Sequence, residues 1–300
     1  MSSNKHSELF SARVSTPRVK LNEDVVLPED TRLQFDEVQS ALKYHKIIYT
    51  EWGFREVDPT GRNMIINLYG QPGTGKTFAA EAIAGTMGLS FIHIGIAELE
   101  SKFVGETAKN ICHSFQLARE EGAILFFDEA DTLLGSRLSS VTQGIDNEIN
   151  AMRSTLLIEL ERHEGIVIFA TNFARNYDPA FVSRIRYHIE FKMPDVTARR
   201  KLFEKFLVAT IPLQEDRSTI INVCADSSVN LSGRDIRNAV RVALPKAFIR
   251  NNQNPVVLLE DLCAAIEEIK KGKENVGVKN FSKSSENEIE ASRRLLGVNG

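Results

Sequence analysis

The stretch "MIINLYGQPGTGKT", residues 64 to 77, decides the fold expected for this chain. An apolar run leads into Gly70, and Gly75, Lys76 and Thr77 complete the pattern G-x-x-x-x-G-K-[ST]. Such a loop binds phosphate when it follows a strand and opens a helix, because its backbone N–H groups surround the anion and the helix N-terminus favours negative charge. A glycine turn that matches the pattern by chance is the alternative, and the apolar run before the loop argues against it.

The phosphate loop also predicts the cofactors. Lys76 is expected to contact the β- and γ-phosphates of ATP, and the Thr77 hydroxyl is expected to hold Mg²⁺. The residues expected to bind the nucleotide in this stretch are Gly70, Pro72, Gly73, Thr74, Gly75, Lys76, Thr77 and Phe78.

Short apolar runs alternate with helical patterns over the first two thirds of the chain. The runs occupy residues 64–70, 90–96, 123–128, 165–172 and 187–191. Continuous apolar runs of this length are typical of parallel strands buried on both faces, and the segments between them repeat apolar residues at helical spacing. The expected fold class is therefore α/β, a P-loop NTPase with a parallel five-stranded sheet sandwiched by helices.

The strands stop after Pro194, and four helical segments follow. We therefore expect a flexible arm at residues 1–22, a large α/β nucleotide-binding domain at 23–193, a small all-helical lid domain at 194–275 and a polar tail at 276–300. Pro245 is expected to kink or end the third helix of the lid, because proline lacks the N–H that a helix interior needs.

Composition excludes several classes of protein. The chain has 300 residues, of which 42% are hydrophobic and 26% charged, so it is long and apolar enough to bury a core. A net charge of -3 gives no overall attraction to nucleic acid or to anionic membranes. No apolar stretch approaches the length of a membrane span, and the three cysteines form no CxxC pair. The sequence predicts a cytoplasmic protein with neither a disulfide framework nor a zinc site.

A second motif, "AILFFDEAD", ends an apolar run in Asp128 and Glu129. Asp128 is expected to hold the Mg²⁺ shell, and Glu129 is expected to polarise an attacking water. The alternative is a strand end followed by acidic residues that form a turn. A simple kinase would use the same loop without needing Glu129, so this glutamate favours water as the nucleophile.

With these motifs in place, the chain from about residue 30 to about 270 resembles the AAA+ ATPases, specifically the type that remodels proteins. Asn172 in "FATN" matches the sensor-one residue that helps to place the water, or else it is an amide that caps a turn. "DPAFVSRIRYHIEF" resembles the arginine-finger segment, with Arg184 on the finger position and Arg186 beside it. The segment departs from the usual "RPGRFD", so the choice between the two arginines stays open. The alternative is that these arginines form a surface salt bridge and have no role as a finger.

The resemblance implies that the finger reaches the γ-phosphate of the adjacent subunit, so a working site requires a homo-oligomer, most simply a hexameric ring. "LSGRDIRNAV" is similar to the sensor-two helix, which places Arg234 on the nucleotide of its own subunit. The protein-remodelling subgroup often has a small residue there, so an arginine at a helix start with no ligand role is the alternative.

"ESKFVGETAKN", residues 100 to 110, resembles the first pore loop of protein-translocating members. Lys102, Phe103, Val104 and Gly105 are the expected substrate contacts, and the alternative is a strand-to-helix connection with one core Phe. Residues 135–150 are expected to form a mobile second pore loop.

Two classes of function follow from the resemblance. The first is an ATP-hydrolysing remodeller or unfoldase that threads a protein through a ring. The second is a nucleic-acid-associated loader or helper ATPase, which the net charge disfavours. The compact chain is similar to small bacterial members, among them the relatives of the pachytene-checkpoint remodellers, which act on HORMA-domain proteins and in bacteria accompany antiphage signalling systems.

Overall fold

The computed structural model describes residues 14–58, 61, 63–95, 99, 106–135, 145–172 and 177–276. The chain divides into two compact units, each of which is described by itself. The first comprises Met1–Ala198 with Ser232–Arg234, and the second comprises Arg199–Leu231 with Asp235–Gly300. The units therefore separate after residue 198, whereas the sequence predicted a boundary after residue 193.

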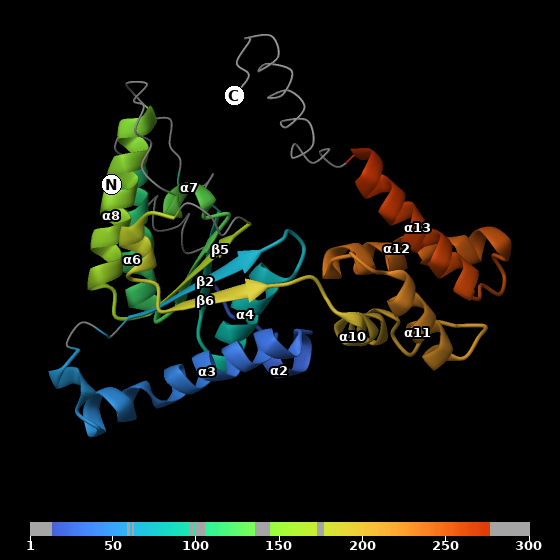
Figure 1. The fold of residues 1–300 in the computed structure, drawn as a ribbon, viewed down its shortest axis with the longest axis horizontal. Helices are drawn as coiled ribbons and strands as arrows, with labels where there is room; N and C mark the ends of the chain where they lie inside the picture. Colours follow the sequence, from blue (N-terminus) through green and yellow to red (C-terminus); the bar gives the residue numbers. More distant parts are fainter. Residues whose placement is uncertain are drawn as a thin grey trace, which may run out of the picture. The chain divides into compact units, whose positions relative to one another are not determined.

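The first unit is built on a six-stranded sheet with the strand order β1-β3-β4-β5-β2-β6 (Figure 1). Five of its strands run parallel and coincide with the five predicted apolar runs. They are β2 (Met64–Gly70), β3 (Phe91–Gly95), β4 (Ile124–Asp128), β5 (Ile166–Thr171) and β6 (Tyr187–Phe191). The predicted α/β class is confirmed.

The sixth strand, β1 (Val14–Ser15), pairs antiparallel with β3, and the sequence did not predict it. The Ser15 hydroxyl donates to the carbonyl of Phe91 at 3.2 Å. Helix α2 (Leu21–Asp24) follows, with Leu21 buried and its backbone N–H donating to the Thr86 hydroxyl at 2.9 Å. The expectation of a flexible arm up to residue 22 is therefore wrong from residue 14 onward, because contacts with distant residues hold this segment.

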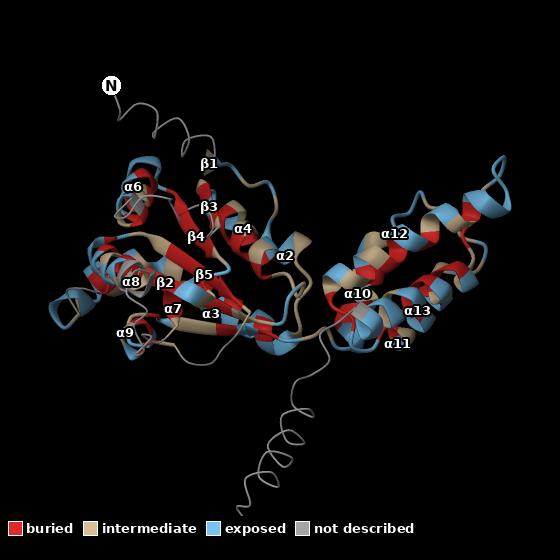
Figure 2. Cartoon of the chain, turned by 90° about the horizontal axis from the view of Figure 1, so that it is seen from above, coloured by how far each residue is buried: buried red, intermediate tan, exposed pale blue. Residues whose placement is uncertain are grey.

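Helices cover both faces of the sheet, which explains why its strands are apolar on both sides (Figure 2). On one face, α2, α3 (Glu29–Lys46) and α4 (Lys76–Met87) pack on a core that includes Phe35, Leu68 and Phe126. On the other face, α6 (Glu106–Glu121), α7 (Asp131–Leu134), α8 (Ile145–Arg162) and α9 (Pro179–Val182) pack on a core that includes Phe115 and Phe169.

Helix α3 continues into a π-helical turn, η1 (Ile47–Glu51), and a 3₁₀ turn, η2 (Phe54–Glu56), follows. The Tyr49 ring in η1 stacks on His45, with the ring centroids 4.4 Å apart. Its hydroxyl donates to Asp58 at 2.9 Å. These contacts hold Tyr49 against the end of α3 and against Asp58.

The described part of the second unit is all-helical, as predicted. Its helices are α10 (Val196–Phe206), α11 (Arg217–Ser227), α12 (Gly233–Arg250) and α13 (Leu259–Val276), around a core that includes Phe203, Ile220 and Leu262. Helix α12 continues past Pro245 to Arg250, so the proline does not end it. Among the described residues, we find no helix that combines the length and the apolar character needed to cross a membrane.

His163, at the end of α8, is buried in the first unit. The structure gives no hydrogen-bond partner to either ring nitrogen, and the ring meets Phe115 edge-on, with the centroids 5.2 Å apart. The pKa of His163 is lowered from 6.5 to about 4, because burial and, to a smaller extent, the nearby Arg119 disfavour the charged ring more than Glu159 favours it. The ring is therefore neutral in the folded protein at neutral pH.

This depressed pKa predicts a loss of stability in mild acid. Well above pH 6.5 the ring is neutral in both folded and unfolded chains, so it contributes no pH dependence there. Below that pH the unfolded chain gains a proton that the folded chain does not bind, so folding becomes less favourable. We expect this group to lower the free energy of unfolding by about 2 kcal/mol between pH 7 and pH 5.

Urea unfolding at the two pH values tests this expectation. The His163→Leu variant, whose side chain does not titrate, should lose less stability than the parent over the same interval. Equal losses in the two proteins would show that His163 is not the group responsible.

Candidate nucleotide-binding site

The loop between β2 and α4 has the backbone that a phosphate loop requires. Gly75 precedes α4 with a φ of +104°, a conformation that side chains other than glycine rarely adopt. A Cβ on Gly70 would lie 2.3 Å from the carbonyl oxygen of Phe191, so that position also demands glycine. The Thr74 hydroxyl donates to the carbonyl of Gln71 at 2.8 Å. The predicted order of strand, loop and helix is confirmed.

Lys76 is the first residue of α4, and its amine lies inside this loop. The Nζ atom donates to the carbonyl oxygens of Gly70 at 2.7 Å and Gln71 at 3.0 Å. It also donates to Oδ1 of Asn172 at 3.0 Å. Burial lowers the Lys76 pKa, and the neighbouring carboxylates of Asp128 and Asp131 oppose that change. A buried amine at a helix N-terminus fits the phosphate groups of a nucleotide.

Thr77 and Asp128 bring oxygen atoms together beside the loop. The Thr77 hydroxyl donates to Oδ2 of Asp128 at 3.0 Å. Burial raises the Asp128 pKa, but hydrogen bonds from His93 and Thr77 outweigh it, so the net shift is downward and the group is a carboxylate at neutral pH. Hydroxyl and carboxylate oxygens are ligands that Mg²⁺ accepts. Thr77 and Asp128 therefore fit this cation, which would neutralise phosphate charge when bound.

Glu129 follows β4 with a backbone φ of +56° and an exposed side chain. A left-handed conformation is unusual for a residue other than glycine, and such strain concentrates at functional sites. The N–H of Glu129 donates to Oδ1 of Asp128 at 3.0 Å, and that of Ala130 donates to Ala170 at 2.9 Å. These bonds fix the turn that separates Glu129 from the buried strand.

Asn172 lies directly after β5, between Lys76 and Asp131. Besides accepting a hydrogen bond from Lys76, it donates its backbone N–H to both carboxylate oxygens of Asp131, each at 3.2 Å. Asn172 therefore sits at the phosphate loop, where a residue that places water is needed. Its role in placing water stays a prediction.

The two candidate finger arginines lie at the opposite end of β6 from the loop. In the register of β6 with β2, Tyr187 pairs with Ile66, whereas Phe191 pairs with Gly70. Arg184 and Arg186 precede Tyr187, so the structure does not bring them to the phosphate loop of the same chain. A role toward a second subunit is compatible with this position.

The two arginines have different surroundings. Arg184 forms an ion pair with the exposed Glu161 on α8, and its Nη1 donates to the carbonyl of Ala180 at 2.8 Å. Arg186 instead donates through Nη2 to the Tyr49 hydroxyl and to the carbonyl of Gly61, each at 3.2 Å.

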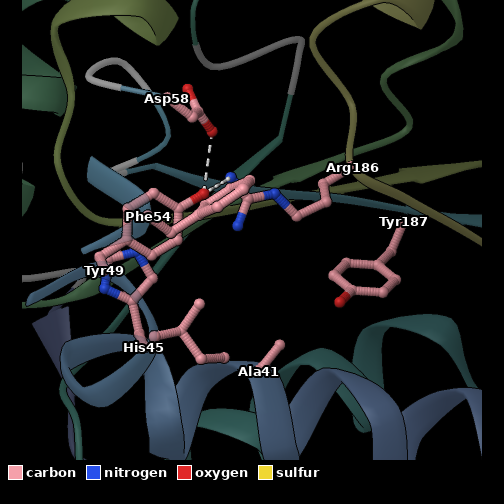
Figure 3. A pocket seen from close by; sticks show the side chains of 8 residues that line it. Ala41, His45, Tyr49, Phe54, Asp58, Arg186 and Tyr187 are labelled. Carbon is pink, nitrogen blue, oxygen red and sulfur yellow. Dashed lines mark hydrogen bonds between the residues drawn. The ribbon is translucent and has the colours of Figure 1, made fainter. Parts of the chain in front are cut away.

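Arg186 and Tyr49 line a cavity of about 330 Å³. Figure 3 shows the Arg186 side chain beside the Tyr49 ring. Its guanidinium lies 5.9 Å from the ring centroid. Ala41, His45, Phe54 and Tyr187 also line this cavity.

Arg234 is grouped with the first unit, together with Ser232 and Gly233. Its backbone N–H donates to the carbonyl of Gly73 at 3.1 Å. A contact between the Arg234 side chain and a nucleotide stays a prediction.

Several other predicted site residues lie outside the residues that the structure describes, and part of the expected second pore loop is helical. Lys102, Phe103, Val104 and Gly105 lie outside the described residues, as do residues 136–144 of the expected second pore loop. Helix α8 begins at Ile145, so the expectation of a mobile loop is wrong for residues 145–150. Phe78 is in α4 and exposed, and its contact with a nucleotide stays a prediction.

One residue at this site was not predicted. The imidazole Nε2 of His93, on β3, lies 3.3 Å from Oδ2 of Asp128. The sequence carried a signal, because His93 is the polar residue in the apolar run "FIHIG". A histidine in a strand is easily interpreted as a core residue. Because His93 is far from Asp128 in sequence, no local pattern indicates their contact.

Comparison with known families agrees with this geometry. Residues 66–193 match the model of the AAA family, the ATPase family associated with various cellular activities. This part of the chain has the fold of an AAA domain. A crystal structure of the FIGL-1 AAA domain in complex with ADP has the same fold, with a TM-score of 0.69 and 20% sequence identity over 98% of this chain and 96% of that one.

Curated relatives extend the similarity beyond the AAA domain match. The proteasome-activating nucleotidase of Saccharolobus islandicus (strain M.14.25 / Kamchatka #1) is 31% identical over an alignment of 270 residues, which covers 88% of this chain and 65% of the relative. The proteasome-associated ATPase of Kribbella flavida is 35% identical over an alignment of 209 residues, which covers 61% of this chain and 35% of the relative. This chain thus spans less than two thirds of the length of these relatives.

Proposed function

We propose that the chain binds ATP with Mg²⁺ at the AAA domain and hydrolyses it to ADP and phosphate. The observation that carries this proposal is that the neighbouring residues Lys76 and Thr77 donate hydrogen bonds to Asn172 and to Asp128, respectively. In this reading Lys76 holds the phosphates, Thr77 and Asp128 hold the cation, and Asn172 and Glu129 act on the attacking water.

The active form is a homo-oligomer, most simply a hexameric ring, in which Arg184 completes the site of the adjacent subunit. Two observations favour Arg184 over Arg186. Arg186 donates to the Tyr49 hydroxyl and the Gly61 carbonyl and lies against the Tyr49 ring, whereas apart from its exposed ion pair Arg184 makes one hydrogen bond, to the carbonyl of Ala180. Arg184 pairs with the exposed Glu161, and exposed ion pairs contribute only about 0 to 1 kcal/mol, so this one is readily exchanged for a phosphate.

Hydrolysis is coupled to the unfolding or remodelling of a protein. The proteasome-activating and proteasome-associated ATPases among the relatives support this class of substrate. Neither they nor the net charge of -3 favour a nucleic-acid loader. A HORMA-domain protein as the substrate in an antiphage system is a finer prediction without support from these relatives. Residues 102–105 would contact the substrate chain, and a cytoplasmic location stays a prediction.

Phe103→Ala tests the coupling. An aromatic side chain that grips a threaded polypeptide gives large contact area at low cost in rotamer entropy, and it does not belong to the nucleotide site. We expect the variant to keep its melting temperature and basal ATP hydrolysis while losing at least about tenfold in the unfolding of a fluorescent reporter protein with an unstructured tail. Basal hydrolysis, melting and reporter fluorescence are measured on the same preparations.

A core role for Phe103 predicts a different pattern. Truncation of a buried Phe costs about 3 to 5 kcal/mol, so melting, hydrolysis and unfolding would fall together. That result would remove the pore-loop assignment. A parent protein that hydrolyses ATP faster with double-stranded DNA, and not with an unstructured polypeptide, would favour the nucleic-acid alternative.

A further inference from the structure

The Asp128 carboxylate is held by three donors from different parts of the chain. Its Oδ1 accepts the backbone N–H of Glu129 at 3.0 Å. Its Oδ2 meets both the Thr77 hydroxyl, at 3.0 Å, and Nε2 of His93, at 3.3 Å. The first two donors belong to the motifs that define the nucleotide site, whereas His93 belongs to neither motif.

The sheet register explains why His93 reaches this carboxylate. Strands β3 and β4 are parallel, His93 pairs with Phe126, and Gly95 pairs with Asp128. Because side chains alternate along a strand, His93, Phe126 and Asp128 share one face of the sheet. The His93 ring lies against the Phe126 ring, with the centroids 5.1 Å apart, and this contact orients its Nε2.

His93 is far more exposed to solvent than its neighbours in β3. Ile92 and Ile94 are fully buried, whereas the His93 side chain is 46% exposed. A side chain that is nearly half exposed contributes little to core packing, so the apolar core does not require a histidine here. Its contact with Asp128 supplies a specific reason for the imidazole.

From these contacts we propose that His93 is a positioning residue for the metal shell of the nucleotide site. The imidazole N–H donates to Oδ2 of Asp128 and holds this oxygen toward the Thr77 hydroxyl, so the two oxygens are oriented before Mg²⁺ arrives. The proposal rests on the proposed function, because it assigns His93 to the cation that accompanies ATP. Donors that orient a metal-binding carboxylate typically change metal affinity about 10- to 100-fold.

The test measures nucleotide binding rather than turnover. The dissociation constant of a fluorescent, non-hydrolysable ATP analogue is determined with Mg²⁺ and with a chelator. The constant in chelator divided by the constant with Mg²⁺ reports how much the cation strengthens binding. We expect His93→Leu, which removes the donor, to reduce this ratio about tenfold and to leave binding in chelator unchanged. His93→Gln keeps an N–H donor at similar reach and should restore the ratio to within about threefold of the parent.

Two controls separate this role from others. His188→Leu changes a histidine of the same sheet, on β6, whose Nδ1 lies 3.5 Å from the Asn67 amide nitrogen, and its ratio should match the parent. Melting temperature checks folding, and His93→Ser, too short to reach Asp128, replaces His93→Leu if the latter does not fold.

Three outcomes overturn the proposal. A parent-like ratio in His93→Leu would show that the imidazole does not act on the cation. Equal losses in His93→Leu and His93→Gln would show that the imidazole, and not a hydrogen-bond donor, is required, as for a direct metal ligand. If the parent binds no nucleotide, the proposed function itself fails, and this outcome is distinguishable because it precedes any comparison of variants.

Discussion

The Glu129→Gln variant is expected to bind ATP as the parent does and to hydrolyse it about 100- to 10,000-fold more slowly, the usual contribution of a general base. The amide keeps the size of the side chain but cannot take a proton from water. Binding should survive because the groups placed around the phosphates and the cation, Lys76, Thr77 and Asp128, are unchanged. Nucleotide affinity and phosphate release, measured on the same preparation, check both halves of the expectation.

The position of Glu129 allows this substitution to change the side chain without disturbing the surrounding structure. Its side chain is exposed, and its backbone N–H, which bonds to Asp128, is retained in the variant. The turn and its left-handed φ therefore need not change. Glu121→Gln, an exposed glutamate at the end of α6, is the matched control and should hydrolyse ATP as the parent does. Hydrolysis by Glu129→Gln at the parent rate would exclude Glu129 as the base.

Features that depend on neighbours in sequence could be predicted from the sequence. The parallel strands follow from continuous apolar runs, and the β2–α4 loop follows from Gly70, Gly75 and Lys76, whose spacing is set by the loop itself. The acidic residues after β4 were found for the same reason. Each of these signals lies within a few residues, where residue type and spacing largely decide the backbone.

Features that depend on distant residues could not be predicted. Strand β1 has two residues, too few for a period-2 pattern, and it is ordered by pairing with β3. The contact between His93 and Asp128 exists because two parallel strands lie in one register, which no local pattern specifies. The tie between Arg186 and Tyr49 joins segments 137 positions apart.

Helix α12 shows that a local rule can also be overridden. Proline removes one backbone hydrogen bond and crowds the preceding turn, so the sequence favoured a kink or an end at Pro245. The helix continues to Arg250, because residues on both sides of the proline, Ala243 and Ala247, are buried in the core of the second unit. Tertiary packing offsets the local cost.

The Arg184→Ala variant is expected to lose about a thousandfold or more in ATP hydrolysis, the size of effect that an arginine finger typically has. The loss should leave nucleotide binding by each chain unchanged, because Arg184 lies at the end of β6 away from its own phosphate loop. Arg162→Ala, an exposed arginine next to Glu161 in sequence, is the matched control and should stay active.

Mixing variants tests whether Arg184 acts on a neighbouring subunit. Lys76→Ala removes the phosphate site but keeps the finger, whereas Arg184→Ala keeps the phosphate site but removes the finger. Each variant alone should be inactive, and random mixing in a head-to-tail ring should pair an intact site with an intact finger at about a quarter of the interfaces. Recovery of hydrolysis toward that fraction, with oligomer size followed by sedimentation, supports a shared site. If the mixture stays inactive while the oligomers do exchange subunits, or if Arg184→Ala alone remains active and Arg186→Ala does not, the assignment of Arg184 is wrong.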